Sequence, residues 1–162
     1  MLANTFNQRL NASGGGAVFF FLFHQVQLQA VVFILGAGGQ VIVMPHSDAK
    51  VLRAAKAAGL YLSPGVATPT EAFAALAEGA DVLKLFPAEQ MGPAVIRAWL
   101  AVLPTGTLLL PVGGVTPDNM QVYFDAGAKG FGLGSGLFKP GMSVDQVASS
   151  AQAYVAAWNA LN

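Results

Sequence analysis

The chain has 162 residues, of which 54% are hydrophobic and only 10% are charged, which predicts one domain that buries part of its surface in a homo-oligomer. Its eight basic and eight acidic side chains cancel without forming a basic run, so we expect no nucleic-acid binding. There is no cysteine and there are only two histidines, so we expect neither a disulfide nor a metal or other cofactor.

The apolar stretch 17–35 is the one candidate for a membrane segment. Four polar side chains near its centre argue against a spanning helix, and the alternation of glutamine with apolar residues over 25–29 predicts a half-exposed strand. A secretory signal is disfavoured because no small-residue cleavage site follows the apolar run. We therefore expect a cytoplasmic protein without membrane attachment.

From about residue 40, strand and helix signals alternate with a short period. The clearest helix start is 68–71, Thr-Pro-Thr-Glu, a capping box with proline at the first helical position. Ser143 with Gln146 forms a second capping box, and Ser47 can cap an earlier helix that ends at Gly59. In chain order we expect strands over 41–44, 60–62, 82–86, 107–112 and 130–133, and helices over 48–58, 69–78, 93–102, 117–126 and 144–160.

Lys84 lies in the middle of the apolar strand 82–86. Alternation places Val82, Lys84 and Phe86 on one face, so Lys84 points into whatever cavity that face lines. Desolvation there would lower the lysine pKa and leave a neutral amine that can attack a carbonyl carbon. The alternative is an edge-strand lysine that extends its ammonium group into water, which is the more common situation.

Five strands that are each followed by a helix imply a parallel sheet with right-handed crossovers, either doubly wound or closed as a barrel. Glycine-rich loops follow the last two strands directly, at 113–114 and 134–136. In α/β barrels such loops bind phosphate through backbone amides, whereas a glycine after a strand more often marks only a tight turn. Two such loops on consecutive strands favour the barrel and leave phosphate binding and turn formation as equal alternatives.

Five short motifs lie in this part of the chain, at 42–45 (Ile-Val-Met-Pro), 63–71 (Ser-Pro-Gly-Val-Ala-Thr-Pro-Thr-Glu), 83–87 (Leu-Lys-Leu-Phe-Pro), 112–117 (Val-Gly-Gly-Val-Thr-Pro) and 132–135 (Gly-Leu-Gly-Ser). In order and spacing they resemble strands four to eight of the class I aldolases of 2-keto-3-deoxy-6-phospho-sugar acids, the KDPG and KDPGal aldolases. The resemblance implies an α/β fold, a parallel (β/α) barrel of the TIM type that assembles as a trimer.

The resemblance also implies a Schiff-base reaction that cleaves 2-dehydro-3-deoxy-6-phosphogalactonate, or the gluconate epimer, to pyruvate and glyceraldehyde 3-phosphate. Lys84 matches the imine-forming lysine of the family, Phe86 matches a ring beside the imine, and Pro45 matches a residue of the pocket floor. The positions that match the loops holding the substrate phosphate are Gly113, Gly114, Val115, Gly134 and Ser135.

The amino-terminal third departs from the family's pattern. In the family, strand one carries an arginine for the substrate carboxylate and strand two carries a glutamate that shuttles protons at the imine. Residues 1–47 contain no Asp or Glu, and their only charged side chain is Arg9. About 40 residues are also too few for three strand-helix units of roughly 25–30 residues each.

The barrel is therefore expected to be incomplete or aberrant in this third. We expect residues 1–40 to be an atypical apolar segment in place of the first barrel units, with 17–35 adding one or two strands. Residues 41–162 should form the units that carry the lysine and the phosphate loops.

Two functions of different class remain open. The first is an aldolase, active or impaired, in which an ordered water or another carboxylate transfers the proton. Glu89 and Glu71 are the nearby carboxylates, and both could equally serve helix-start electrostatics. The second is a non-catalytic remnant that keeps a sugar-phosphate pocket and buries its open sheet edge against a partner chain. A phosphosugar isomerase or thiamine-phosphate synthase is disfavoured, because neither explains a buried Lys84.

Overall fold

The structure is a computed structural model, and it describes residues 20–21 and 28–161. All strand pairs in this part of the chain are parallel and follow the order of the sequence. The strands are β1 (Phe20–Phe21), β2 (Val41–Val43), β3 (Tyr61–Ser63), β4 (Gly65–Val66), β5 (Leu83–Leu85) and β6 (Leu109–Pro111). The predicted parallel α/β architecture is thus confirmed for strands 41–44, 60–62, 82–86 and 107–112.

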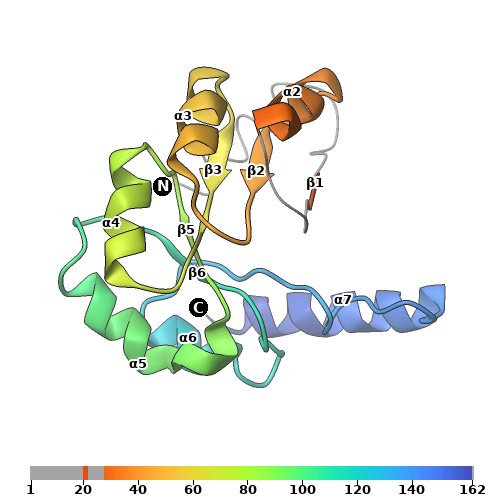
Figure 1. Cartoon of the computed structure of the whole chain (residues 1–162). Helices are drawn as coiled ribbons and strands as arrows, with labels where there is room; N and C mark the ends of the chain where they lie inside the picture. The colour runs from red at the N-terminus through yellow and green to blue at the C-terminus, as the bar shows by residue number, and fades with distance from the viewer. Residues whose placement is uncertain (1–19, 22–27, 162) are drawn as a thin grey trace.

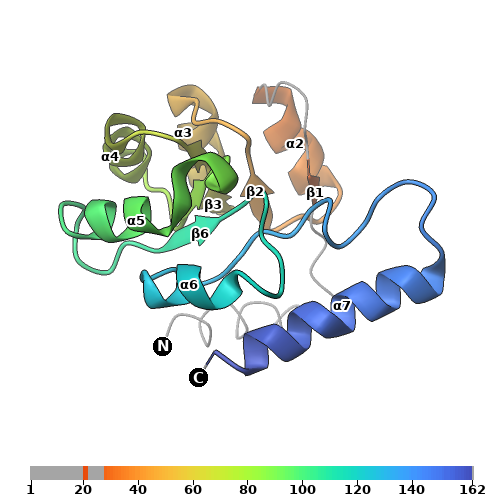
Figure 2. The same ribbon diagram turned by 90° about the horizontal axis from the view of Figure 1, so that it is seen from below.

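Strands β1, β2 and β3 form one hydrogen-bonded ladder, and β4, β5 and β6 form a second. Only Pro64 separates β3 from β4, and its carbonyl accepts a hydrogen bond of 2.9 Å from the Lys84 backbone N–H. The two ladders are therefore halves of one curved sheet, along which helices α3, α4, α5 and α6 follow one another on the outside (Figures 1 and 2).

The last predicted strand, 130–133, is reduced to one parallel bridge between Val112 and Gly132. Two glycines in this segment supply no side chains for packing, which weakens a strand. A Cβ on Gly132 would lie 2.4 Å from Cγ2 of Val112, so the bridge itself requires glycine. Among the described residues the parallel pairing runs from β1 to this bridge and does not close on itself.

The amino-terminal prediction is wrong in part. Residues 25–27 of the predicted strand 25–29 lie outside the described residues, and Leu28 and Gln29 belong to helix α2 (Leu28–Gly36). Their apolar neighbours Val31 and Ile34 are buried at helical spacing, so packing of one helix face overrides the short alternating pattern. No helix in the part of the chain that the structure describes is long and apolar enough to cross a membrane.

Local capping signals account for most helix boundaries. Helix α4 (Pro69–Ala77) begins with the predicted capping box, as does α7 (Val144–Asn159). Helix α3 (Ala49–Ala57) is capped by Asp48 rather than by Ser47, because the Asp48 carboxylate accepts hydrogen bonds from Lys50 and Val51.

Two helices differ from their predicted extent. Helix α5 (Ala88–Leu100) begins before the predicted start, with a first turn that Gly92 interrupts at φ 70. Helix α6 (Met120–Asp125) begins later than predicted. There the Asn119 side chain bonds to the Gly114 carbonyl and the Thr116 N–H, which holds the segment before the helix as a turn.

The main core fills the space between the sheet and helices α2 to α6. Leu62, Leu83, Leu85 and Leu109 are fully buried on the outer face of the sheet. A second cluster joins the start of α6 to α7 and contains Val115, Met120, Tyr154 and Leu161.

One close approach in this fold should be intolerant of any side chain. A Cβ on Gly65 would lie 2.3 Å from the Pro45 carbonyl oxygen, and both groups belong to backbone that cannot move independently. Gly65→Ala should lower the free energy of unfolding by about 1–3 kcal/mol or more in denaturant titration. Gly36→Ala is the matched control, because nothing lies within 4 Å of its added methyl group and its stability should change little. Equal effects of the two substitutions would contradict the close packing of the Pro45 backbone against β4.

Candidate active site

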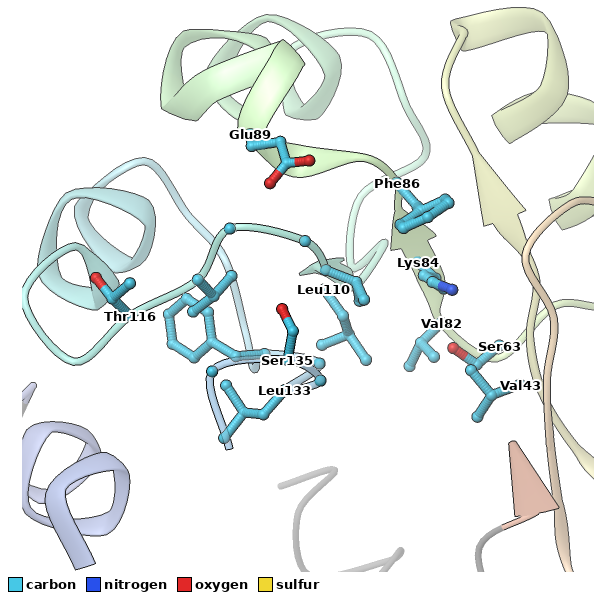
Figure 3. A pocket seen from close by; sticks show the side chains of 18 of the residues that line it. Val43, Ser63, Val82, Lys84, Phe86, Glu89, Leu110, Thr116, Leu133 and Ser135 are labelled. Atoms are coloured by element: carbon cyan, nitrogen blue, oxygen red, sulfur yellow. The ribbon is translucent and has the colours of Figure 1, made fainter. Parts of the chain in front are cut away.

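A pocket of about 860 Å³ opens on the inner face of the sheet (Figure 3). Its lining residues alternate with residues that face the helices. On β5, Lys84 lines the pocket, whereas Leu83 and Leu85 lie on the outer face. The lining residues from the strands and their ends are Val41, Val43, Tyr61, Ser63, Val82, Lys84, Leu110 and Val112. The period of two therefore places the lysine inside the curve of the sheet.

Lys84 is 4% exposed and lies on a central strand, because β5 pairs with β4 on one side and β6 on the other. Its Nζ lies 4.2 Å from the centroid of the Phe86 ring, and it forms no ion pair within the described part of the chain. Burial therefore lowers the pKa of Lys84 below its ordinary value. A larger fraction of this amine is neutral, and hence nucleophilic, than for a lysine in water.

The two glycine loops form the other side of the pocket. Gly113 and Gly114 have φ values of 100 and 68, in the left-handed region that glycine adopts without strain. Six residues of the two loops line the pocket, namely Gly113, Gly114, Val115, Gly134, Ser135 and Gly136. Apart from Gly113, which takes part in the bridge to Gly132, their backbone N–H groups donate to no other described residue. Such a set of free amides can bind an anion.

Lys139 also lines the pocket, in the loop that follows Ser135. Its side chain has no ion-pair partner among the described residues, so it can supply positive charge near the free amides. The sequence analysis missed Lys139, because a lysine in a loop has no pattern that separates it from any surface lysine. No group of three or more His, Cys, Asp or Glu side chains in the described ranges could hold a metal ion.

Ser63 is a second lining residue that sequence reasoning missed. It is 6% exposed and lies near Lys84 and Val82 in Figure 3. The alternation along 61–63 could have predicted this position, since Tyr61 and Ser63 lie on the pocket face of the strand and Leu62 lies on the opposite face. A buried hydroxyl beside the amine can hydrogen-bond to a polar group of a bound ligand.

The two candidate carboxylates have different surroundings. Glu71 is engaged in its capping box, where Oε2 accepts hydrogen bonds from the N–H groups of Ala67 and Thr68 at 2.8 and 2.9 Å. The Ala67 hydrogen bond is the main cause that lowers the Glu71 pKa, and Glu71 does not line the pocket. Glu89, in the first turn of α5, does line it, and its carboxylate lies against Gly114. Glu89 is therefore the better placed of the two.

Phe86 and Val115 line the pocket, but Pro45 does not. The Pro45 carbonyl packs against Gly65, the residue that pairs with Lys84 in the strand register. Register partners share a face of the sheet, so the Pro45 carbonyl lies on the Lys84 side of β4, although Pro45 is not among the residues that line the pocket.

Comparisons with known proteins agree with this geometry. The family model for KDPG and KHG aldolase matches residues 24–150, and the chain belongs to this family. It is 47% identical over 121 residues to the 2-dehydro-3-deoxy-6-phosphogalactonate aldolase of Escherichia coli (strain K12), covering 75% of this chain and 59% of that protein. The probable enzyme of that name from Rhizobium meliloti (strain 1021) is 47% identical over 124 residues, covering 76% of this chain and 58% of that protein. The chain thus spans less than two thirds of the length of these relatives.

Solved structures give the same assignment. A structure described as native KDPGal superposes with a TM-score of 0.82 at 38% identity, covering 95% of this chain and 74% of that one. The 2-keto-3-deoxy-6-phosphogluconate aldolase of Zymomonas mobilis ZM4, solved with 3-phosphoglycerate, has a TM-score of 0.69 at 28% identity, covering 82% of this chain and 63% of that one.

The buried amine should make stability depend on pH. Because the Lys84 pKa is lower in the folded chain, the unfolded chain binds more protons between that pKa and the ordinary value of 10.5, so stability should rise with pH across this window. In Lys84→Met this contribution, at most about 1.4 kcal/mol per pH unit, should disappear.

The measurement is the free energy of unfolding of both proteins between neutral and alkaline pH, with exposed Lys129→Met as the control. Parallel pH profiles for Lys84→Met and the unchanged chain would show that Lys84 is not desolvated.

Proposed function

We propose that this protein is a class I aldolase that cleaves 2-dehydro-3-deoxy-6-phosphogalactonate, or its gluconate epimer, to pyruvate and glyceraldehyde 3-phosphate. The observation that carries the proposal is a buried lysine on one side of a pocket whose other side presents free backbone amides. The names of the relatives support the same reaction, and their family supports a TIM-type barrel as the complete fold.

The reaction follows from the amine. Neutral Lys84 attacks the keto carbon of the sugar acid, and loss of water from the carbinolamine gives an iminium ion. The iminium accepts the electron pair of the bond between the third and fourth carbons as that bond breaks. The hydroxyl on the fourth carbon loses its proton and becomes the aldehyde of glyceraldehyde 3-phosphate. The remaining enamine takes up a proton, and hydrolysis releases pyruvate and restores Lys84.

The substrate phosphate is proposed to bind at the glycine loops. Gly114 and Val115, on the loop that Gly113 begins, and Gly134 and Ser135 on the other loop offer N–H donors to the phosphate oxygens. Lys139 adds positive charge at the same end of the pocket. Phe86 covers the imine position with its ring, while Lys84 reacts at the apolar end.

Proton transfer is the step of this reaction with the fewest candidate side chains in the chain. Residues 1–47 contain no carboxylate, and Glu89 is the carboxylate that lines the described pocket. In this proposal Glu89 or an ordered water takes and returns the protons. The alternative is a non-catalytic remnant that still binds sugar phosphate, and the absence of an acid in residues 1–47 favours it.

We further propose a homo-oligomer, a trimer by the family resemblance, in which residues 41–162 carry the barrel units of the site and residues 1–40 stand in place of the first units. Exposed apolar side chains such as Val102, Phe138 and Trp158 are consistent with a partner surface. A cytoplasmic location is proposed because a charged phosphate ester does not cross an apolar bilayer unaided.

The experiment that tests the function is imine trapping. Borohydride reduction in the presence of pyruvate should leave one pyruvate adduct, located by mass spectrometry on the peptide that contains Lys84. Lys84→Arg keeps the positive charge but should give no adduct, while Lys129→Ala should be trapped like the unchanged chain. An adduct at another residue, or none at saturating pyruvate, would refute the Schiff-base proposal.

Trapping and turnover should separate in this chain. A positioned carboxylate typically contributes about 10²- to 10⁴-fold to a proton transfer, so cleavage should be slower than in the Escherichia coli relative by at least about two orders of magnitude. A coupled assay for glyceraldehyde 3-phosphate measures the rate, with Lys84→Ala as the blank. A rate equal to that of the relative would mean that a carboxylate does act here, and loss of that rate in Glu89→Gln would identify it.

A further inference from the structure

Tyr154 contacts both glycine loops of the pocket, although it lies far from them in the sequence. The residue is 5% exposed and comes from α7. Its hydroxyl donates a hydrogen bond of 2.8 Å to the carbonyl oxygen of Val115, in the first loop. A Cβ on Gly136, in the second loop, would lie only 2.1 Å from the same hydroxyl oxygen. One atom therefore touches both loops.

The first loop depends on side chains for its shape. Asn119 donates to the Gly114 carbonyl at 2.8 Å, and Tyr154 donates to the next carbonyl along the chain. In a trans peptide the C=O and N–H groups point in opposite directions, so holding the Gly114 carbonyl on one side leaves the Val115 N–H directed to the other. The hydroxyl of Tyr154 thus acts on the same loop whose amides are free.

The second loop, at 134–136, is positioned by van der Waals contact with Tyr154 rather than by a hydrogen bond. The absence of a side chain at Gly136 lets this backbone approach the Tyr154 hydroxyl and the Val115 carbonyl, which would lie 3.4 Å from an added Cβ. Gly136 has no positive φ, so the requirement for glycine is one of space and not of backbone conformation.

We propose that Tyr154 is a positioning residue that fixes the spacing of the two glycine loops and thereby sets the affinity of the pocket for a phosphate group. The inference rests on the proposed phosphate site and adds a residue to it. A phosphate needs donors from both loops at once, and misplacement of one loop by a fraction of an ångström weakens every hydrogen bond to it.

The surroundings of Tyr154 suit this role. Its ring packs with Val115, Met120 and Leu161 in the second core cluster, which holds the side chain in one place. Burial raises the pKa of Tyr154, so its hydroxyl keeps the proton that it donates to Val115. The position of α7 is thereby transmitted to both loops.

The test is a double-mutant cycle with Tyr154→Phe and Gly136→Ala. Tyr154→Phe keeps the ring and removes the hydroxyl, and it should weaken binding of inorganic phosphate about three- to tenfold by titration calorimetry. Gly136→Ala should weaken phosphate binding more strongly, because the methyl group displaces the hydroxyl. In the double variant the hydroxyl contact at 2.1 Å is gone, and the methyl group meets the ring carbon at 3.3 Å and the Val115 carbonyl oxygen at 3.4 Å, so the added loss should be much smaller than in the single variant.

Two further measurements separate positioning from general damage. The pyruvate concentration for half-maximal trapping at Lys84 should not change in Tyr154→Phe, since pyruvate carries no phosphate group for the loops to bind. Tyr123→Phe is the matched control, because this buried tyrosine bonds to the Ala88 carbonyl on α5 instead of a glycine loop, and its phosphate affinity should stay the same.

Unchanged phosphate affinity in Tyr154→Phe, or additive losses in the cycle, would overturn the role of Tyr154. A chain that traps pyruvate at Lys84 but binds no phosphate would overturn both this role and the proposed phosphate site, while leaving the Schiff-base chemistry intact. A chain that binds phosphate but traps no pyruvate would refute the aldolase proposal. The double-mutant cycle on phosphate binding would then decide the role of Tyr154 by itself.

Discussion

Burial of the Lys84 amine within an apolar sheet is the constraint on which the rest of the site depends. A lysine on an edge strand could extend its charge into water, but β5 has a neighbour on each side, and Lys84 is 4% exposed. A buried charge is costly, so burial lowers the pKa of Lys84 and increases the share of the neutral amine. The same desolvation that weakens the fold therefore prepares the nucleophile.

The pocket divides its chemistry between two ends. The lysine end is apolar, and desolvation there favours the neutral amine. The loop end offers free backbone amides and Lys139, which favour an anion. Glu89 adds a negative charge beside Gly114, so an anion at this end must be held by several donors at once. This requirement explains why the position of each glycine loop matters more than any single contact.

Local signals predicted the regular elements well where one interaction decides the conformation. The capping box at 68–71 and the glycines that end α3 and α4 act within a few residues, and the structure has them as expected. The signals failed where two local solutions compete. Ser47 and Asp48 are both competent caps one residue apart, and in the structure the Asp48 carboxylate accepts the capping hydrogen bonds. The alternating pattern at 25–29 was too short to outweigh helical packing of Val31 and Ile34.

The sequence by itself determined the parallel strand order, the inward direction of Lys84 and the loops at 113–114 and 134–136, because alternation, capping and glycine conformation are properties of neighbouring residues. Only the tertiary structure decided that β5 is a central strand, that the Pro45 carbonyl contacts Gly65, and that Lys139 lines the pocket. It also brought Tyr154 against loops that precede it by many residues. These contacts join segments far apart in the chain, and their spacing is set by how helices and sheet pack, which no local pattern records.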